Sequence, residues 1–345
     1  MTRSGKPRLA MYWASSCGGC EVSLLNIGEK LLLLGETFEL VFCPCLADFK
    51  LADLQALPDG AIDLCLFNGA IRSSENREMA YLLRRKSALL VAFGSCATEG
   101  CVPGLANLTT AAALRRTVYL GGPSTENPGG LQPQCRSEVR EGSLALPALY
   151  DTVRTLDQVE SVDYSVPGCP PESPRVWEAL ERLAASLVGG APLPPRGTVL
   201  GALETAVCEE CPRTRISRRV ERFHRVHERA PDPGACLLEQ GLLCLGVATR
   251  GGCGALCPRV AMGCRGCYGA PPGVEDQGAR MVAAIAALSA AGDPEGGEAR
   301  LREEIEDAMS TIVDPAGTFY RYSLAHSLLR RARVRPPAGG GDAGR

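Results

Sequence analysis

Residues 1–190 alternate short apolar runs with segments whose apolar residues recur at helical spacing. The runs predict β-strands, and the periodic segments predict α-helices. The predicted strands are Leu9–Ala14, Phe38–Phe42, Ile62–Phe67, Ala88–Phe93 and Val162–Val166. The predicted helices are Glu21–Leu34, Glu75–Arg85 and Pro174–Leu187. Such alternation indicates βαβ units and a parallel, doubly wound sheet, in which chemistry gathers where loops leave the carboxyl ends of strands.

The pattern changes after Gly189–Arg196, a Gly/Pro-rich stretch that we interpret as a linker. Beyond it the strand signals vanish, and only 281–291 and 301–309 show helical spacing. We therefore predict a first domain over 1–190, a cysteine-rich, largely helical or irregular domain over 197–335, and a disordered tail over 336–345. Because the second domain is rich in Gly, Cys and Pro, we expect bound metal to stabilise it.

Charge and hydropathy exclude several classes of protein. The 345 residues carry a formal net charge of −2, which gives no electrostatic reason to expect nucleic acid or an anionic membrane as a partner. No apolar run approaches the length of a membrane span, and Met1–Arg8 lacks the features of an export signal. We therefore expect a cytoplasmic protein. Its compartment is reducing, which argues against disulfides as the reason for 17 cysteines.

Eight cysteines lie within the 60 residues from Cys208 to Cys267. One C-x-x-C pair opens this run, another closes it, and four single cysteines lie between: Cys208 and Cys211, Cys264 and Cys267, and Cys236, Cys244, Cys253 and Cys257. The run makes two sets of four thiolates, and one such set is what an iron–sulfur cube or a structural zinc ion requires. Zinc sites usually pair two close C-x-x-C motifs, whereas here the other ligands are spread singly. A zinc-binding interaction protein without a redox role is therefore the less favoured alternative.

Three loops of the first domain carry a third set of four cysteines beside glycines. Cys17 and Cys20 follow the first predicted strand, Cys96 follows the fourth, and Cys169 follows the fifth. Because these loops leave the carboxyl ends of parallel strands, we expect them to converge on one edge of the sheet. A thioredoxin-like redox pair at Cys17 and Cys20 is an alternative, but it leaves Cys96 and Cys169 unexplained.

The same residues carry a resemblance to a known family. The motifs C-x-G-C-E, G-x-C-A and G-C-P-P read here Cys17–Glu21, Gly94–Ala97 and Gly168–Pro171. The chain resembles the small, electron-transferring subunit of [NiFe]-hydrogenases, most of all the cytoplasmic methyl-viologen-reducing type linked to heterodisulfide reductase. The resemblance implies a flavodoxin-like first domain whose proximal [4Fe–4S] cluster is held by Cys17, Cys20, Cys96 and Cys169.

The resemblance also implies two clusters in the cysteine run. Cys208, Cys211, Cys236 and Cys244 would hold the distal cluster, and Cys253, Cys257, Cys264 and Cys267 the medial one. Exported members have histidine at the position of Cys208 and proline at that of Cys257, and the proline leaves them a three-iron medial cluster. Here Cys257 restores the fourth ligand, so three [4Fe–4S] clusters are expected. Their all-thiolate ligation should lower their reduction potentials.

Partners are implied in the same way. The nickel–iron centre would belong to a large partner subunit that lies against the loops of the proximal set. Electrons would leave from the distal cluster to an acceptor subunit of [2Fe–2S], flavin or heterodisulfide-reductase type, within a higher oligomer of heteromers. A related subunit of a quinone-linked respiratory complex is the second alternative. It lacks the C-terminal cysteine region and has adjacent cysteines where Cys17 and Cys20 are separated here.

For several other residues the sequence gives weaker evidence of a functional role. Glu21 supplies a favourable charge in the first turn of a helix, and a sharper hypothesis gives it a part in proton movement at the subunit interface. Cys101 is expected near the proximal cluster but unbound. The other cysteines are expected to be structural or incidental: Cys43, Cys45, Cys65 and Cys135.

The histidine spacing and a Gly/Pro-rich stretch predict two further features of the chain. His224 and His227 lie in a predicted basic helical stretch, Arg218–Arg229, which favours a solvated face over metal ligation. The Gly/Pro-rich stretch Gly121–Gly130 predicts a surface excursion. No G-x-G-x-x-G follows a strand, so the sequence carries no nucleotide-binding fingerprint.

Overall fold

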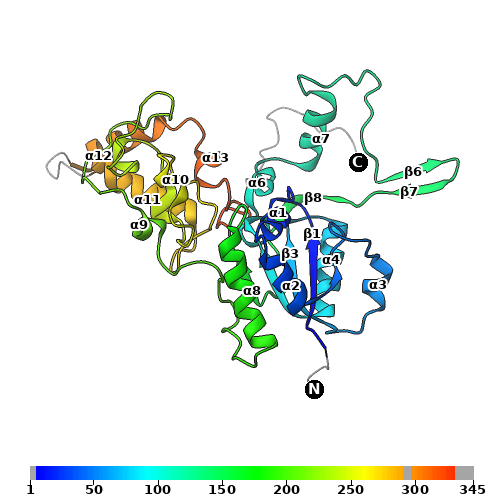
Figure 1. Cartoon of the computed structure of the whole chain (residues 1–345). Helices are drawn as coiled ribbons and strands as arrows, with labels where there is room; N and C mark the ends of the chain where they lie inside the picture. The colour runs from blue at the N-terminus through cyan, green and yellow to red at the C-terminus, as the bar shows by residue number, and fades with distance from the viewer. Residues whose placement is uncertain (1–4, 291–296, 331–345) are drawn as a thin grey trace.

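The computed structural model describes residues 5–290 and 297–330, which form two lobes (Figure 1). The N-terminal lobe contains all of the described strands, and the C-terminal lobe consists of helices and irregular loops. Within these ranges, none of the helices has the length and apolar character that a membrane span needs.

The centre of the N-terminal lobe is a parallel sheet of five strands in the order β2-β1-β3-β5-β9. Its strands are β1 (Arg8–Trp13), β2 (Glu39–Phe42), β3 (Ile62–Asn68), β5 (Ser87–Phe93) and β9 (Tyr164–Val166). Counted within the sheet alone, this is the flavodoxin-like order 2-1-3-4-5. The predicted doubly wound α/β fold is confirmed, and every strand of the sheet overlaps its predicted run.

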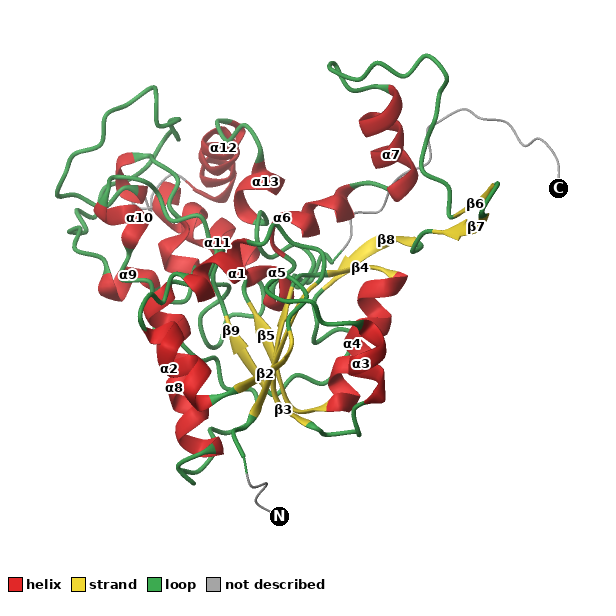
Figure 2. Ribbon diagram, turned by 45° about the vertical axis from the view of Figure 1, so that its right-hand side comes forward, coloured by secondary structure: helices red, strands yellow, loops and turns green. Residues whose placement is uncertain are grey.

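Helices cover both faces of this sheet, as Figure 2 shows. One layer contains α1 (Gly19–Leu25), α2 (Lys30–Thr37) and α8 (Ser173–Leu187), and the other contains α3 (Leu51–Ala56) and α4 (Ser74–Lys86). Within β1, Leu9 and Met11 pack in the core that includes α8, whereas Ala10 packs in the core that includes α4. This two-residue period is that of a strand buried on both faces.

Two parts of this lobe differ from the prediction. The predicted helix Glu21–Leu34 is two helices, α1 and α2, and between them Gly28 has a φ of +69°, a left-handed conformation that glycine adopts without strain. The structure also adds β4 (Ile71–Ser73), paired antiparallel with β8 (Leu149–Arg154). β8 escaped prediction because only one of its six residues is buried, so it has no apolar run.

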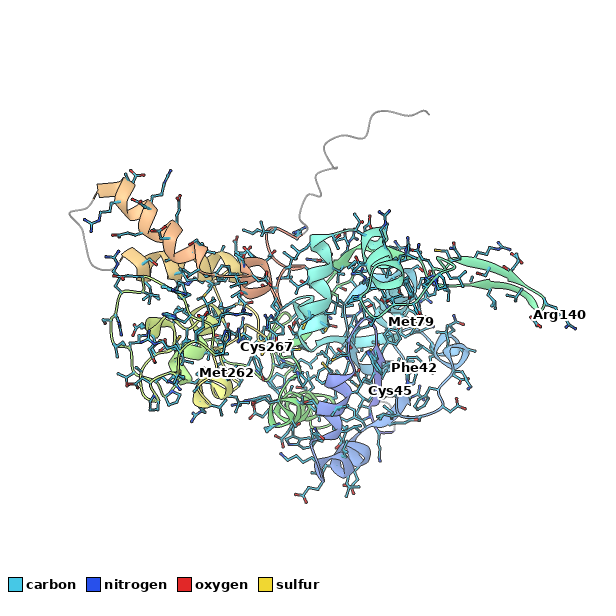
Figure 3. All side chains as sticks on the ribbon, turned by 90° about the horizontal axis from the view of Figure 1, so that it is seen from above. Phe42, Cys45, Met79, Arg140, Met262 and Cys267 are labelled. Carbon is cyan, nitrogen blue, oxygen red and sulfur yellow. The ribbon has the colours of Figure 1, made fainter. Side chains whose placement is uncertain are left out.

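A long excursion separates β5 from β9. It begins with four short helices and continues through a hairpin to β8. The helices and hairpin strands are α5 (Ser95–Thr98), α6 (Cys101–Gly104), η1 (Leu105–Leu108), α7 (Ala111–Leu120), β6 (Arg136–Val139) and β7 (Gly142–Ala145). Every residue of β6 and β7 is exposed, and Figure 3 labels Arg140 at the far end of this hairpin. Residues 121–130 are almost all exposed, which confirms the predicted surface excursion.

The C-terminal lobe has no strand among its described residues. Its helices are α9 (Val207–Glu210), η2 (Leu238–Gln240), η3 (Leu245–Ala248), α10 (Leu256–Arg259), α11 (Gln277–Ala290), α12 (Gly297–Ser310) and α13 (Pro315–Phe319). α11 and α12 confirm the helices predicted at 281–291 and 301–309, although Ala291 lies outside the described residues. Met281 and Ile285 of α11 anchor a small apolar core in this lobe.

The predicted helix at Arg218–Arg229 is wrong, because this stretch is irregular. Val220 and Phe223 are buried at helical spacing, which explains the prediction. Their backbone N–H groups, however, bond to other segments: that of Val220 donates to the Leu288 carbonyl at 3.3 Å, and that of Phe223 to Thr311 Oγ1 at 3.0 Å. Tertiary partners therefore replace the hydrogen bonds of a helix.

Backbone and side-chain hydrogen bonds join the two lobes. Past the predicted linker, the N–H of Leu200 donates to the Ser165 carbonyl of β9 at 2.7 Å. The last described residues return to the N-terminal lobe, where the N–H of Cys101 donates to the Tyr322 carbonyl at 2.9 Å and Asn107 Nδ2 donates to the Arg330 carbonyl at 2.8 Å. The predicted domain limits at 190 and 197 therefore remain predictions, and the predicted tail 336–345 lies outside the described residues.

Candidate metal centres

The predicted proximal set lies at the carboxyl edge of the parallel sheet. Cys17 and Cys20 follow β1, Cys96 follows β5, and Cys169 follows β9. The thiol of Cys20 interacts electrostatically with those of Cys17 and Cys169. Cys101 is a fifth thiol here, because its Sγ lies 3.4 Å from that of Cys169 and it also bonds to Cys96. The structure thus brings the four predicted cysteines together, with Cys101 between Cys96 and Cys169.

Glycine is required beside this set. Gly94, between β5 and Cys96, has a φ of +82°, and a Cβ at this position would lie 2.2 Å from Cys20 Sγ. Gly168 has a φ of +127°, and its Cβ would lie 2.6 Å from Pro171 Cα. Since Cβ atoms do not tolerate such contacts, the glycines allow the backbone to approach the thiols closely.

The predicted distal set gathers at the side of the C-terminal lobe that faces α11. The thiol of Cys208 interacts with those of Cys236 and Cys244, and the thiol of Cys244 interacts with that of Cys211. A cavity of about 320 Å³ is lined by Cys208, Cys236 and Cys244 together with Arg215 and residues of α11. The sequence offered no signal for Arg215, whose guanidinium bonds to the Cys208 thiol.

The predicted medial set lies closer to the N-terminal lobe. The thiol of Cys267 interacts with those of Cys253 and Cys257, and the thiol of Cys264 interacts with that of Cys267. Glu210, from the loop of the distal set, accepts hydrogen bonds from the backbone of Gly252 at 3.0 Å and of Ala255 at 3.2 Å. The sequence analysis did not predict this link between the distal and medial sets, because nothing in the sequence distinguishes Glu210 from its neighbour Glu209.

The three sets follow one another in space. Cys267 of the medial set interacts with the backbone and the thiol of Cys169 in the proximal set. Cys264 of the medial set donates its backbone N–H to Cys244 Sγ of the distal set at 3.2 Å. Figure 3 labels Cys267 where the two lobes meet. The spatial order is therefore proximal, medial and distal.

The donor chemistry fits iron–sulfur clusters better than single ions. Burial raises the pKa of Cys208 to about 11 and that of Cys267 to about 12, so their thiolates need a nearby positive charge. A zinc ion needs ligands about 2.0–2.3 Å from one point. Within 5–290 and 297–330, no three His, Cys, Asp or Glu side chains are grouped so as to hold one metal ion. All three predicted sets consist of thiols alone, which is the ligand set of an iron–sulfur cube.

Comparison with known proteins gives the family. Residues 17–183 match the family described as NADH ubiquinone oxidoreductase, 20 Kd subunit. The chain is also 40% identical over 330 residues to the iron-sulfur subunit of the F420-non-reducing hydrogenase of Archaeoglobus profundus, over 94% of this chain and 98% of that protein. The chain belongs to this family of hydrogenase subunits. The resemblance predicted from the cysteine motifs is confirmed.

Two other proteins are similar to this hydrogenase subunit. It is 35% identical to the vhu-type F420-non-reducing hydrogenase subunit of Methanococcus voltae, over 94% of this chain and 98% of that protein. Among solved structures, an NAD+-reducing [NiFe]-hydrogenase in the H2-reduced state is 30% identical, over 56% of this chain and 95% of that chain, with a TM-score of 0.46. The respiratory-subunit match ends at residue 183, whereas the hydrogenase relatives also cover the C-terminal lobe.

Glu21 of this hydrogenase subunit is buried next to Cys20. Asn68 Nδ2 donates to both of its carboxylate oxygens, at 2.7 and 2.8 Å, and to Ser16 Oγ at 2.9 Å. Asn68 is fully buried at the end of β3. Glu21 is therefore held by a fixed side-chain partner rather than by the solvent, and its predicted part in proton movement remains a prediction.

The remaining cysteines and histidines lie apart from the three sets. The thiols of Cys43 and Cys45 are 3.4 Å from each other, Cys65 is buried in β3, and Cys135 is exposed beside the hairpin. His227 is exposed, and His224 Nδ1 lies 3.9 Å from Glu228 Oε2. These positions agree with the structural or solvated roles expected for them.

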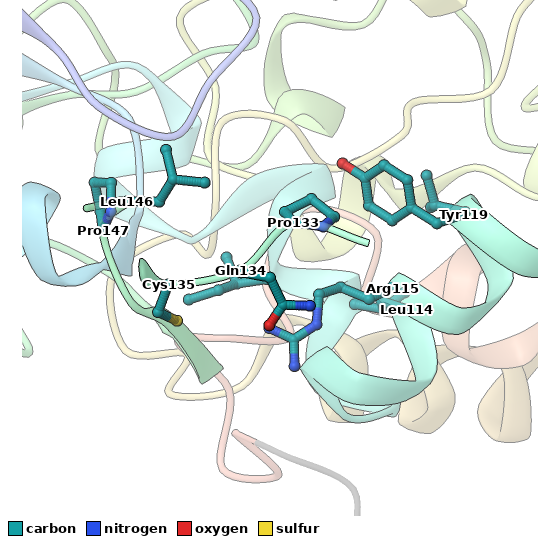
Figure 4. Close-up of a pocket in the computed structure, with 10 residues that line it drawn as sticks. Leu114, Arg115, Tyr119, Pro133, Gln134, Cys135, Leu146 and Pro147 are labelled. Atoms are coloured by element: carbon teal, nitrogen blue, oxygen red, sulfur yellow. The ribbon is translucent and has the colours of Figure 1, made fainter. Parts of the chain in front are cut away.

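One further cavity belongs to none of the sets. It has a volume of about 330 Å³ and lies between α7 and the base of the hairpin, where Leu114, Tyr119 and Leu146 line it and Cys135 lies at its edge (Figure 4). Its lining contains no residue of the three predicted cysteine sets. We therefore do not assign the redox site to it.

Substituting Gly94 tests the close approach at the proximal set. In a Gly94→Ala variant the Cβ would displace Cys20, so we expect loss of about four of about twelve irons per subunit. Gly28→Ala is the matched control, because Gly28 also has a positive φ but its Cβ would meet nothing within 4 Å. Iron and acid-labile sulfide would be measured on both purified variants. Equal iron content in the two would contradict the steric argument.

A charged cluster fastens the returning C-terminal segment near the proximal set. His326 Nε2 lies 3.3 Å from Asp157 Oδ2, and its Nδ1 lies 3.6 Å from Glu99 Oε2. The hydrogen bond with Asp157 raises the pKa of His326 to about 9. Burial raises the pKa of Glu99 to about 7. Because both values exceed those of the unfolded chain, both groups stabilise the fold at low pH and lose that contribution as the pH rises.

This cluster predicts a pH-dependent loss of stability in a His326→Gln variant. The variant should be less stable by about 1 kcal/mol at a pH below 6.5, a modest figure because the imidazole is 41% exposed and screened by solvent. The difference should shrink as the pH passes 9, where the native imidazole loses its charge. Denaturant unfolding at both pH values measures it, with His227→Gln as an exposed control. A pH-independent difference would rule out the charge.

Proposed function

We propose that this hydrogenase subunit relays electrons between a large partner subunit, which carries the nickel–iron centre, and an acceptor subunit. Three [4Fe–4S] clusters would serve this role. Their proposed ligands are Cys17, Cys20, Cys96 and Cys169 at the proximal position, Cys253, Cys257, Cys264 and Cys267 at the medial position, and Cys208, Cys211, Cys236 and Cys244 at the distal position.

The observation that carries the proposal is the contact between successive sets. The Cys169–Cys267 interaction and the Cys264–Cys244 hydrogen bond connect the proximal set to the medial set and the medial set to the distal set. A metal-binding protein without a redox role has no need for such continuity. Membership of the hydrogenase family supports the same choice over zinc.

The residues of the chain prepare each position. When bound, iron–sulfur clusters supply one-electron carriers whose potentials depend on charge, hydrogen bonds to sulfur and solvent exposure. Cys20, Cys96 and Cys264 are buried, which keeps water from these thiols. The backbone N–H of Cys264 donates to Cys244 Sγ of the distal set, and the guanidinium of Arg215 interacts with the Cys208 thiol, so both stabilise negative charge on sulfur.

The proximal edge suits a large protein partner. Cys17 is exposed there, and three apolar side chains near it are also exposed: Trp13 by 45%, Val22 by 55% and Leu25 by 39%. An exposed apolar group of this kind is typical of a protein interface. We propose that the large subunit covers it, and that Glu21 behind it assists proton movement there.

The distal set, at the opposite end of the series of three cysteine sets, would face the acceptor. A [2Fe–2S], flavin or heterodisulfide-reductase-type subunit fits the proposal, within a higher oligomer of heteromers. We propose a cytoplasmic location, where a reducing environment would keep cysteines available as cluster ligands.

Purification of the native complex tests this proposal. We expect a large hydrogenase subunit to co-purify, about twelve irons and as many acid-labile sulfides per copy of this chain, and hydrogen-dependent reduction of methyl viologen. A paramagnetic signal should follow reduction with dithionite. A colourless preparation that contains zinc and no sulfide would refute the proposal.

A further inference from the structure

Residues 213–229 form a strongly basic segment within a chain of net negative charge. This arginine segment contains seven arginines and two glutamates, whereas the whole chain has a net charge of −2. In sequence it lies between Cys211 and Cys236, two of the proposed distal ligands. The segment is therefore positively charged and lies next to the proposed distal ligands in sequence, where electrons would leave the subunit.

The backbone fixes the arginine segment to the loops of the distal set. The N–H of Cys236 donates to the Thr214 carbonyl at 2.8 Å, and the N–H of Thr214 donates to the Gly234 carbonyl at 2.9 Å. Further along, the N–H of His224 donates to the Gly241 carbonyl at 2.7 Å, just before Cys244. The buried side chains of Val220 and Phe223 hold the middle of the segment in the core of the lobe.

Some of these arginines have structural roles. Arg213 donates to the carbonyls of Pro258, Asp232 and Ala235 at 2.8, 2.8 and 3.0 Å. Arg219 forms an ion pair with Glu304 at 2.6 Å. The guanidinium groups of Arg213 and Arg219 are therefore bonded within the fold and are not available to a partner.

The other arginines are oriented differently. Four of them are exposed: Arg215, Arg218, Arg222 and Arg225. None of the four is in an ion pair in the part of the chain that the structure describes. Arg218 and Arg222 line a cavity of about 390 Å³, and Arg215 reaches the Cys208 thiol. Guanidinium groups therefore extend from the distal thiols to the surface.

We propose that the arginine segment is the docking surface for an acidic face of the electron-accepting protein. This inference rests on the proposed function and adds the charge of the partner. Guanidinium groups bind carboxylates through paired, charge-assisted hydrogen bonds. Opposite charge also accelerates encounter, and the partner would meet the surface directly over the distal thiols. A nucleic acid is disfavoured because the rest of the chain carries more acidic than basic residues.

The test uses the purified complex and an acidic [2Fe–2S] ferredoxin as the probe. The variant is Arg218→Gln/Arg222→Gln. The control, Arg116→Gln/Arg140→Gln, removes the same charge from exposed positions in the N-terminal lobe. We expect the KM for ferredoxin to rise about tenfold in the first variant only, with a weaker salt dependence. Hydrogen-dependent reduction of methyl viologen, a small dication, measures the integrity of the complex in every variant.

Each outcome decides the matter. If viologen is reduced but the two double variants have the same KM for ferredoxin, the docking proposal is wrong and the proposed function stands. The same conclusion follows if the unchanged complex reduces viologen but does not bind ferredoxin. If the unchanged complex reduces neither acceptor, the proposed function itself fails. If a labelled single-stranded oligonucleotide loses binding in the first variant while the KM is unchanged, the segment serves nucleic acid instead.

Discussion

A Cys96→Ala variant of the complex should lose hydrogen-dependent reduction of viologen by at least about a hundredfold, because the proximal set would lack a ligand. Cys96 lies directly after β5, is buried, and shares Cys101 as a close neighbour with Cys169. The iron content should fall by about four atoms per chain. Hydrogen/deuterium exchange should persist, since that chemistry belongs to the proposed large subunit.

The neighbouring thiol of Cys101 makes this prediction sharper. If Cys101 can replace Cys96 as a ligand, the single variant will keep its iron, and only a Cys96→Ala/Cys101→Ala variant will lose it. Cys135→Ala is the matched control, because Cys135 is exposed beside the hairpin and outside all three sets. Full iron and full activity in the double variant would show that this edge of the sheet holds no cluster.

A Cys244→Ala variant should separate the two ends of the relay. Cys244 is the distal thiol that accepts a hydrogen bond from the backbone of medial Cys264, and it lines the distal cavity with Cys208 and Cys236. Its loss should remove about four irons and reduce electron transfer to a protein acceptor by at least about a hundredfold. Reduction of viologen should fall far less, because a small dye can approach other parts of the complex.

Spectroscopy on the same variant identifies the cluster that is lost. In dithionite-reduced samples, the signal of one cluster should disappear while the others remain. The control is Cys65→Ala, which removes a thiol buried in β3 and should cost stability without changing the iron content. Retention of all iron in the Cys244→Ala variant would remove Cys244 from the proposed ligand set.

The sequence predicted the sheet well, because its strands are continuous apolar runs. β3 and β5 are buried along nearly their whole length, and that pattern is readable without any structure. β8 and the β6–β7 hairpin were missed for the opposite reason, since they are mostly exposed and carry no such run. The predicted helix at Arg218–Arg229 failed because Val220 and Phe223 find hydrogen-bond partners elsewhere in the fold.

The candidate sites were predictable to a different extent. Cysteine spacing and strand-end position indicated all twelve proposed ligands, because few other functions need that many thiols. The resemblance implied the order of the sets, but sequence could not reveal the contacts between them, since those of Cys267 with Cys169 and of Cys264 with Cys244 depend on tertiary packing. Glu210 was missed for the same reason, because it acts on a cysteine loop distant from it in the chain, and Arg215 was missed because nothing in the sequence separates it from the other arginines of its segment.

The return of the last described segment to the N-terminal lobe sets an order of events during biosynthesis. The backbone N–H of Cys101, beside the proximal thiols, donates to the Tyr322 carbonyl, so that neighbourhood is incomplete until Tyr322 has been synthesised. A cluster assembled on the earliest cysteines before that point would lack this contact. Premature termination before Tyr322 would leave the first-made site open even though all of its ligands had already been translated.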